Sequence, residues 1–154
     1  MMIVPELGVR GGPAALEFYT AAFGARVEFQ VGDESIVAQL AVGDARFWVH
    51  DESPPHGIAS PRTVGGATTR LLLVVDDPDV VVARAVAAGA TLHTPVGDSH
   101  GWRLGRIEDP YGHHWEIGCP LGMSALSMPT VASRERHPSR ARSCIPYPGP
   151  GLPS

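Results

Sequence analysis

Two stretches of the chain place apolar residues three or four positions apart, which is the spacing of one side of a helix. In the first stretch, Leu16, Tyr19 and Phe23 form the apolar side of a predicted helix over about residues 13–23. A second helix is predicted over about residues 78–88. Both stretches begin with Pro and are followed by Gly, which are favoured at the first turn of a helix and just after its end.

Short stretches of alternating apolar and polar residues surround each helix and predict four strands beside it. These strands cover about residues 3–9, 25–31, 35–42 and 45–51 around the first helix, and about residues 69–75, 90–96, 102–108 and 113–118 around the second. Each helix therefore follows one strand and precedes three. The pattern predicts two tandem βαβββ units, over about residues 3–52 and 67–118, joined by a loop over residues 53–66.

The two units are also related in sequence. Residues 13–33 align without a gap with residues 78–98, so that Pro, Gly-Ala and Val-Gly-Asp fall at equivalent positions. These residue types begin helices, end them and form turns, which gives the repeat a structural basis. We therefore expect an α+β fold built from one unit used twice, within a domain over residues 1–119.

Beyond that domain the composition changes. Of the 15 prolines, 7 lie in residues 120–154, together with 4 arginines and one acidic residue, and this segment has little hydrophobic periodicity. An irregular Pro/Arg-rich tail is therefore predicted. Residues 1–119 hold 8 arginines against 15 acidic residues. This acidic body gives no general electrostatic reason to bind nucleic acid or an anionic membrane, so neither is expected as a partner.

The two cysteines, Cys119 and Cys144, are too few for a disulfide framework or a zinc ribbon. We expect two free thiols in a reducing cytoplasm. The first residues lack a basic start followed by a long apolar stretch, so no signal peptide is predicted. The longest aliphatic run, over residues 71–75, is far shorter than the roughly 20 residues of a membrane span. A cytoplasmic location is therefore expected.

Strand alternation separates an apolar face, which should lie under the helices, from a polar face. The polar face is predicted to carry Glu6, Arg46, Trp48, His50, Arg70, His114 and Glu116. A half-buried sheet face with both charge signs and a large aromatic ring is either ordinary solvent surface or a ligand site. Alternation alone leaves the two possibilities open.

Five stretches, in their order along the chain, resemble the vicinal oxygen chelate superfamily, which includes glyoxalase I, bleomycin-resistance proteins and extradiol dioxygenases. The stretches are VPELGVRGGPAALEFYTAAFGA, AQLAVGDARFWVHDE, PRTVGG, LLLVVDDPDVVVARAVAAGA and GRIEDPYGHHWEIG. The chain looks most like the short bacterial proteins labelled glyoxalase-like. The resemblance implies that the two units form a cup of curved mixed sheets, with units paired within or between chains.

In the metal-using members of this family, His, Glu or Gln from the first and last strand of each unit bind the metal, which stabilises an anion formed during the reaction. The corresponding positions here are Val4, Trp48, Arg70 and Glu116. Only Glu116 has the chemistry of a metal ligand, since valine and indole cannot bind a cation and a guanidinium repels one. We therefore expect no metal cofactor and an ion pair between Arg70 and Glu116 across the cup.

A rearranged metal site is the alternative. His50 and His114, with Glu6 and Glu116, could bind Zn, Ni, Fe or Mn one layer away from the family positions. His113 and His114 cannot chelate one ion together, because neighbouring strand residues point to opposite faces.

The predicted function is the binding of a small, planar or anionic organic molecule in the cup, as in bleomycin-resistance proteins. The candidate ligand-binding residues are Glu6, Trp48, His50, Arg70, Trp102, His114 and Glu116. Trp48 and Trp102 are candidates for stacking on a planar ligand, and Glu116 is the best candidate for a catalytic residue. The alternatives are a metal-dependent lyase, isomerase or dioxygenase of the glyoxalase type, and a dimeric scaffold with a vestigial cup. A homodimer is expected in each case, because short sheets leave exposed edges and apolar faces.

Overall fold

A computed structural model describes residues 1–122 and Cys144, and it confirms the α+β fold with two βαβββ units. The first unit contains β1 (Glu6–Val9), α1 (Gly12–Phe23), β2 (Arg26–Val31), β3 (Val37–Val42) and β4 (Ala45–Asp51). The second contains β5 (Arg70–Val74), α3 (Pro78–Ala87), β6 (Thr91–Ser99), β7 (Trp102–Glu108) and β8 (His114–Pro120). The predicted loop between them holds two short helical turns, η1 (Pro54–His56) and α2 (Pro61–Val64).

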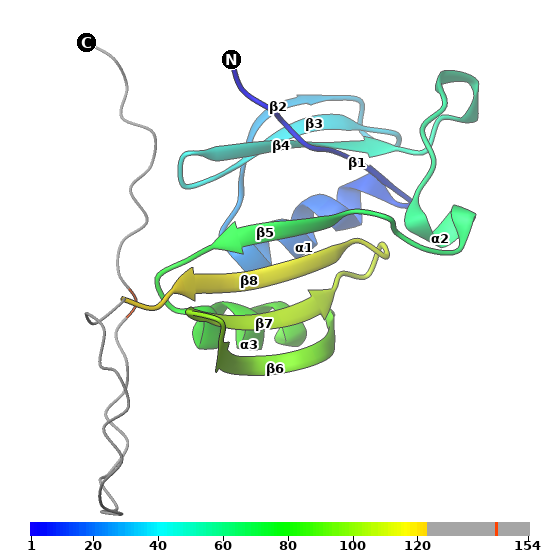
Figure 1. Ribbon diagram of the computed structural model, residues 1–154. Helices are drawn as coiled ribbons and strands as arrows, with labels where there is room; N and C mark the ends of the chain where they lie inside the picture. The colour runs from blue at the N-terminus through cyan, green and yellow to red at the C-terminus, as the bar shows by residue number, and fades with distance from the viewer. Residues whose placement is uncertain (123–143, 145–154) are drawn as a thin grey trace, which may run out of the picture.

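Each unit forms one four-stranded mixed sheet, and the two sheets have the same topology. The strand orders are β1-β4-β3-β2 and β5-β8-β7-β6 (Figure 1). The first and last strand of each unit are parallel, and the other pairs are antiparallel. Glu6 lies beside Trp48 in the first sheet, and Arg70 lies beside His114 in the second. Laterally paired residues share a face, so the polar residues predicted for each strand gather on one side of their sheet.

A carboxylate accepts hydrogen bonds from the first backbone N–H groups of each main helix, but the two carboxylates come from different parts of the chain. Asp77 accepts a hydrogen bond from the backbone N–H of Val80, as expected for the residue before α3. At α1 the residue before the helix is Gly11, which has no side chain to serve as a cap. Asp51, at the end of β4, accepts from the N–H of Gly12 at 2.8 Å and of Ile36 at 2.8 Å. One carboxylate thus connects the start of α1 to two strands.

The units share one hydrophobic core, with α1 between the apolar faces of both sheets (Figure 1). The Tyr19 ring centroid lies 5.2 Å from that of Phe47 on β4 and 5.9 Å from that of Trp115 on β8. Phe47 and Trp115 are themselves 5.8 Å apart. The sheets therefore approach one another through the faces that carry the helices.

This packing decides where the polar faces point. Trp48 alternates with Phe47 along β4, and Glu116 alternates with Trp115 along β8, so both point away from the shared core. Within one chain, the two polar faces lie on different sides and do not face one another.

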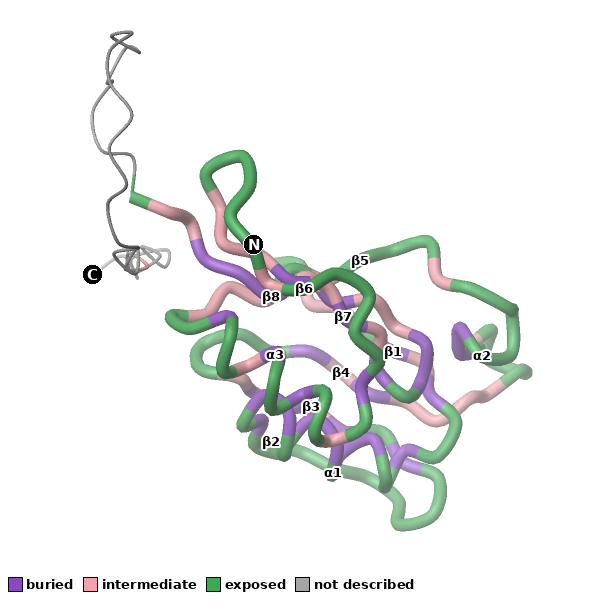
Figure 2. The backbone as a smooth tube through the Cα atoms, turned by 90° about the horizontal axis from the view of Figure 1, so that it is seen from below, coloured by how far each residue is buried: buried purple, intermediate pink, exposed green. Residues whose placement is uncertain are grey.

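Burial follows the same arrangement. Figure 2 shows buried backbone along α1, β3, β4 and β8, whereas β2 and β6, the outer strands, are almost entirely exposed. Among the exposed positions are apolar side chains of the first sheet, namely Val27, Phe29, Val31 and Val37. No described helix has both the length and the apolar character that crossing a membrane requires.

The expectation of two free thiols is wrong. Cys119, which is buried near the end of β8, forms a disulfide with Cys144, and Leu121 forms an isolated antiparallel bridge with Cys144. Sequence spacing alone cannot show that two cysteines 25 positions apart meet in space. The cysteines therefore give no support for a reducing compartment, and a cytoplasmic location stays a prediction. The irregular tail predicted over residues 120–154 lies outside the described residues, apart from residues 120–122 and Cys144.

Candidate functional site

The polar face of the first sheet brings together three of the predicted ligand-binding residues. The Trp48 and His50 rings are 6.2 Å apart on β4, and Glu6 Oε2 on β1 lies 3.7 Å from His50 Nε2. Phe29 on β2 joins them, with its ring centroid 5.8 Å from that of Trp48 in an edge-to-face arrangement. Arg46, also predicted for this face, is turned to the outer strand, where its Nε donates to Glu28 Oε2 at 2.8 Å.

His50 stands out on this face because its side chain is only 15% exposed and its Nε2 is buried without a hydrogen bond. It is the only such buried side-chain nitrogen or oxygen in residues 1–122 and Cys144. Buried polar atoms in folded proteins nearly always have a partner, so an unpartnered one needs an explanation. The carboxylate of Glu6 is too far from His50 Nε2 for a hydrogen bond. A modest movement of that carboxylate, or a polar atom of a bound ligand, would give this nitrogen a hydrogen-bond partner.

The polar face of the second sheet holds the expected ion pair. Arg70 Nη1 donates to Glu116 Oε1 at 2.9 Å, so the prediction that these side chains meet is confirmed. They are diagonal neighbours on the adjacent strands β5 and β8, rather than opposite one another across a cup. The pair is partly exposed to solvent, with side-chain exposures of 57% for Arg70 and 27% for Glu116. Pairs of this kind contribute little to stability.

The four positions that correspond to the family's metal ligands do not make a metal site. Trp48 lies on the first sheet, whereas Arg70 and Glu116 lie on the second, on a face that points in another direction. Val4 precedes β1 and offers no donor atom. The only carboxylate of the four, Glu116, is already bonded to a guanidinium, and that guanidinium keeps its charge at any ordinary pH.

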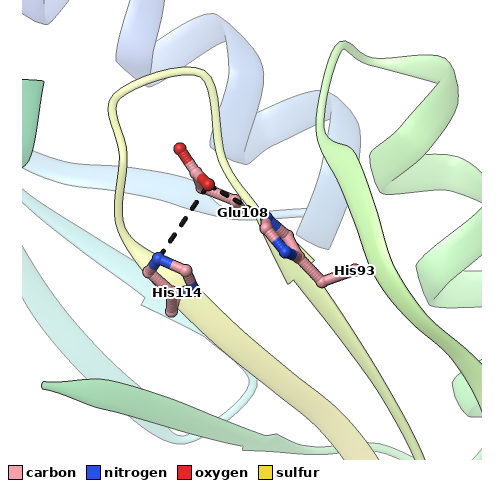
Figure 3. A group of neighbouring side chains, drawn as sticks. All are labelled: His93, Glu108 and His114. Carbon is pink, nitrogen blue, oxygen red and sulfur yellow. Dashed lines mark hydrogen bonds and ion pairs between the residues drawn. The ribbon is translucent and has the colours of Figure 1, made fainter. Parts of the chain in front are cut away.

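The second sheet carries a different cluster, which includes two residues that the sequence analysis did not select. His93 on β6, Glu108 on β7 and His114 on β8 bring ligand atoms within 4.8 Å of one another (Figure 3). His93 Nε2 lies 2.9 Å and His114 Nε2 lies 3.9 Å from Glu108 Oε2. The sequence could have predicted that Glu108 lies opposite His114, because the two residues flank the Asp-Pro-Tyr-Gly turn of a hairpin. It could not have predicted that His93 lies beside them.

Two other candidates lie elsewhere. His113 points to the opposite side from His114, as alternation predicts, and its Nε2 is 2.8 Å from the carbonyl oxygen of Gly8. Trp102 stands at the start of β7 beside Pro120, six residues before Glu108, which is about 20 Å along a strand. It therefore joins neither cluster.

A cleft of about 330 Å³ lies between β1 and the segment that leads from α2 into β5. Leu7, Leu71 and Val64 give it apolar walls, while Glu6, Thr69 and His113 place polar groups at its edges. Its size is at the lower limit for a small-molecule site. Glu6 borders both this cleft and the polar face of the first sheet.

Comparisons with known proteins agree with this architecture. The sequence model of the Glyoxalase/Bleomycin resistance protein/Dioxygenase superfamily matches residues 4–117. An uncharacterized protein of Mycobacterium tuberculosis (strain ATCC 25618 / H37Rv) is 34% identical over 125 residues, which cover 76% of this chain and 73% of that protein.

Two solved structures show the same fold. TioX from Micromonospora sp. ML1 matches with a TM-score of 0.61 and 26% identity, over 77% of this chain and 97% of TioX. A gene product of Arabidopsis thaliana matches with a TM-score of 0.62 and 26% identity, over 76% of this chain and 97% of that protein.

Proposed function

Because this chain belongs to the glyoxalase/bleomycin resistance protein/dioxygenase superfamily, we propose that it binds a small planar organic molecule on the polar face of its first sheet. The proposed contacts are Trp48 and Phe29 for stacking and His50 and Glu6 for polar recognition. No metal takes part at the four family positions in this proposal, since Val4, Trp48 and Arg70 cannot serve as ligands there.

The observation that carries the proposal is the unpartnered Nε2 of His50, which is buried beside a partly exposed aromatic pair. Phe29 is 50% exposed, and it meets Trp48 edge to face. Aromatic surface next to a few polar atoms is typical of sites that bind planar ligands, because the rings remove apolar area from water and the polar atoms fix orientation.

A homodimer would complete the cup. In one chain the two polar faces point in different directions, so each lacks an opposite wall. The exposed Val31 and Val37 lie on the same face as Phe29 and extend its apolar surface, and such surface is commonly covered in an oligomer. In this arrangement the second sheet of another copy lies over the first sheet. Its Arg70–Glu116 pair then contributes the charged wall that suits an anionic ligand.

The test uses 8-anilinonaphthalene-1-sulfonate, a planar aromatic anion whose emission rises when it leaves water. We expect saturable binding, and we expect Trp48→Ala to weaken it by about tenfold or more, as for a buried aromatic contact. Trp102→Ala is the matched control, because it removes the same ring from the same type of element outside the cluster. Equal weakening by both variants, or no saturable binding at all, contradicts the proposal. Thermal unfolding of each variant shows that it is folded.

A metal-dependent reaction of the glyoxalase type is the second candidate function, with Glu116 as its candidate catalytic residue. One observation favours it, namely the His93, Glu108 and His114 cluster, which lies outside the family positions.

A further inference from the structure

We propose that His93, Glu108 and His114 form a binding site for a divalent transition-metal ion, with zinc as the representative ion. Neither His93 nor Glu108 corresponds to a family ligand position, and Glu116, the only residue at those positions with the chemistry of a metal ligand, is bonded to Arg70. Its three residues differ from those proposed to contact the ligand on the first sheet.

The sheet itself holds the three side chains together. Glu108 and His114 are directly paired on the antiparallel strands β7 and β8, so their side chains leave the same face. On β6, Leu92 pairs with Ile107 and Thr94 pairs with Arg106, and the shift between them leaves His93 without a partner residue. An unpaired residue of this kind marks a β-bulge. Thr91 pairs with Glu108 and shares its face, so His93, two residues further along β6, projects from that face by ordinary alternation.

The distances suit a tetrahedral ion. Two ligands that are each about 2.0–2.1 Å from zinc lie about 3.3 Å apart. The His93 Nε2 to Glu108 Oε2 distance of 2.9 Å and the His114 Nε2 to Glu108 Oε2 distance of 3.9 Å lie on either side of that value. The three ligand atoms lie within 4.8 Å of one another, so side-chain rotations that bring them to this separation place them around one ion (Figure 3). Binding removes the proton between His93 Nε2 and Glu108 Oε2, which passes to His93 Nδ1 or to solvent.

A neighbouring residue positions the carboxylate. Arg62, in α2, places Nη2 3.0 Å from Glu108 Oε1. This contact occupies one carboxylate oxygen and leaves Oε2 directed at the histidines, which is how outer residues orient metal ligands. Arg62 also offsets the charge of Glu108, so a bound dication leaves the site positive. Its remaining coordination position would then favour water, hydroxide or an anionic oxygen of a ligand.

The donor set selects the class of ion. Two imidazole nitrogens and one carboxylate oxygen are the ligands of open zinc sites and of iron(II) sites that bind small molecules, whereas Ca²⁺ and Mg²⁺ prefer oxygen ligands alone. The site is accessible, with side-chain exposures of 39% for His93, 20% for Glu108 and 30% for His114.

The experiment titrates the full-length protein, free of any purification tag, with zinc chloride in a calorimeter. We expect one equivalent to bind, and His93→Ala, His114→Ala and Glu108→Gln each to weaken binding by about tenfold or more, since each removes one of three ligands. Cobalt(II) in place of zinc should give visible absorption bands with the parent protein and lose them with these variants. Calcium chloride should give no comparable binding.

The matched control is His100→Asn. His100 is an exposed histidine in the β6–β7 turn with a φ of 51°, a conformation that asparagine tolerates well. This variant should bind zinc like the parent protein. The proposal is overturned if the parent protein shows no saturable zinc binding at millimolar concentration, or if His93→Ala binds as tightly as the parent.

Thermal unfolding without metal identifies variants that are misfolded, and Glu108→Gln, which keeps the shape of the side chain, covers the case in which an alanine variant is unstable. The first-sheet experiment with 8-anilinonaphthalene-1-sulfonate uses different residues. Its failure and the failure of zinc binding are therefore distinguishable.

Discussion

The hydroxyl of Tyr19 donates a 2.6 Å hydrogen bond to Asp109 Oδ2, which connects α1 of the first unit to the β7–β8 turn of the second. Both residues are buried. The same carboxylate accepts from the Trp115 indole at 2.9 Å and from the backbone N–H groups of Tyr111 and His113. Asp109 is thus a buried carboxylate at the junction of the two units, held by four donors and, among the residues that the structure describes, by no cation.

We expect Tyr19→Phe to destabilise the protein by about 1.5–3 kcal/mol, the range for a lost hydrogen bond to a charged group. Chemical denaturation followed by circular dichroism measures the change. Tyr111→Phe is the control, because its hydroxyl makes no hydrogen bond to the described residues. A similar loss in both variants would show that the bond between Tyr19 and Asp109 has no special role.

The same contact predicts an alkaline limit to stability. Burial, followed by the charge of Asp109, raises the pKa of Tyr19 well above its usual value. A group whose pKa is raised by folding stabilises the fold fully below its unfolded pKa, near 10 for tyrosine, and this contribution is lost as the pH rises toward the folded value. The free energy of unfolding should therefore decline above about pH 10. The decline should be shallower in Tyr19→Phe, and an equal decline in both proteins would contradict this origin.

Asp51 predicts a local effect on α1. Its carboxylate is the hydrogen-bond acceptor for the first turn of a helix whose preceding residue is glycine. Asp51→Ala should lower the free energy of unfolding by about 1–2 kcal/mol, as for other lost helix caps. Asp44→Ala, at an exposed turn, removes the same charge and should have little effect. Urea denaturation of the two variants makes the comparison.

The disulfide predicts a simple chemical result. Denatured, non-reduced protein should give no reaction with a thiol reagent, and reduction should release both Cys119 and Cys144. Cys144→Ser should leave one thiol that reacts slowly in the folded protein, because Cys119 is only 1% exposed. Labelling followed by mass spectrometry reads both outcomes. Two labelled cysteines in the non-reduced protein would contradict the pairing.

The proposed homodimer is tested by light scattering. A dimer mass at tens of micromolar is expected, because the exposed Phe29, Val31 and Val37 on one face of the first sheet would be covered by a second copy. Phe29→Glu should shift the mass toward that of a monomer, since it places a charge in the apolar surface. A monomer mass for the parent protein would contradict the proposal.

Local patterns in the sequence were sufficient for the secondary structure and for the assignment of faces. Helical spacing of Leu16, Tyr19 and Phe23 predicts α1, and strand alternation places Glu116 and His114 on the face opposite Trp115. These features depend on periods of a few residues, which the chain displays directly. Because residues 13–33 are repeated as residues 78–98, the same pattern predicts the same kinds of element in the second unit.

Tertiary structure alone decided how those faces are arranged. The meeting of Phe47 with Trp115 separates the two polar faces, and it divides the predicted ligand-binding residues into two clusters. The pairing of β6 with β7 brings His93 to Glu108, and the fold brings Cys119 to Cys144. Each of these contacts depends on strand register or on packing between separate segments, which no period of a few residues displays.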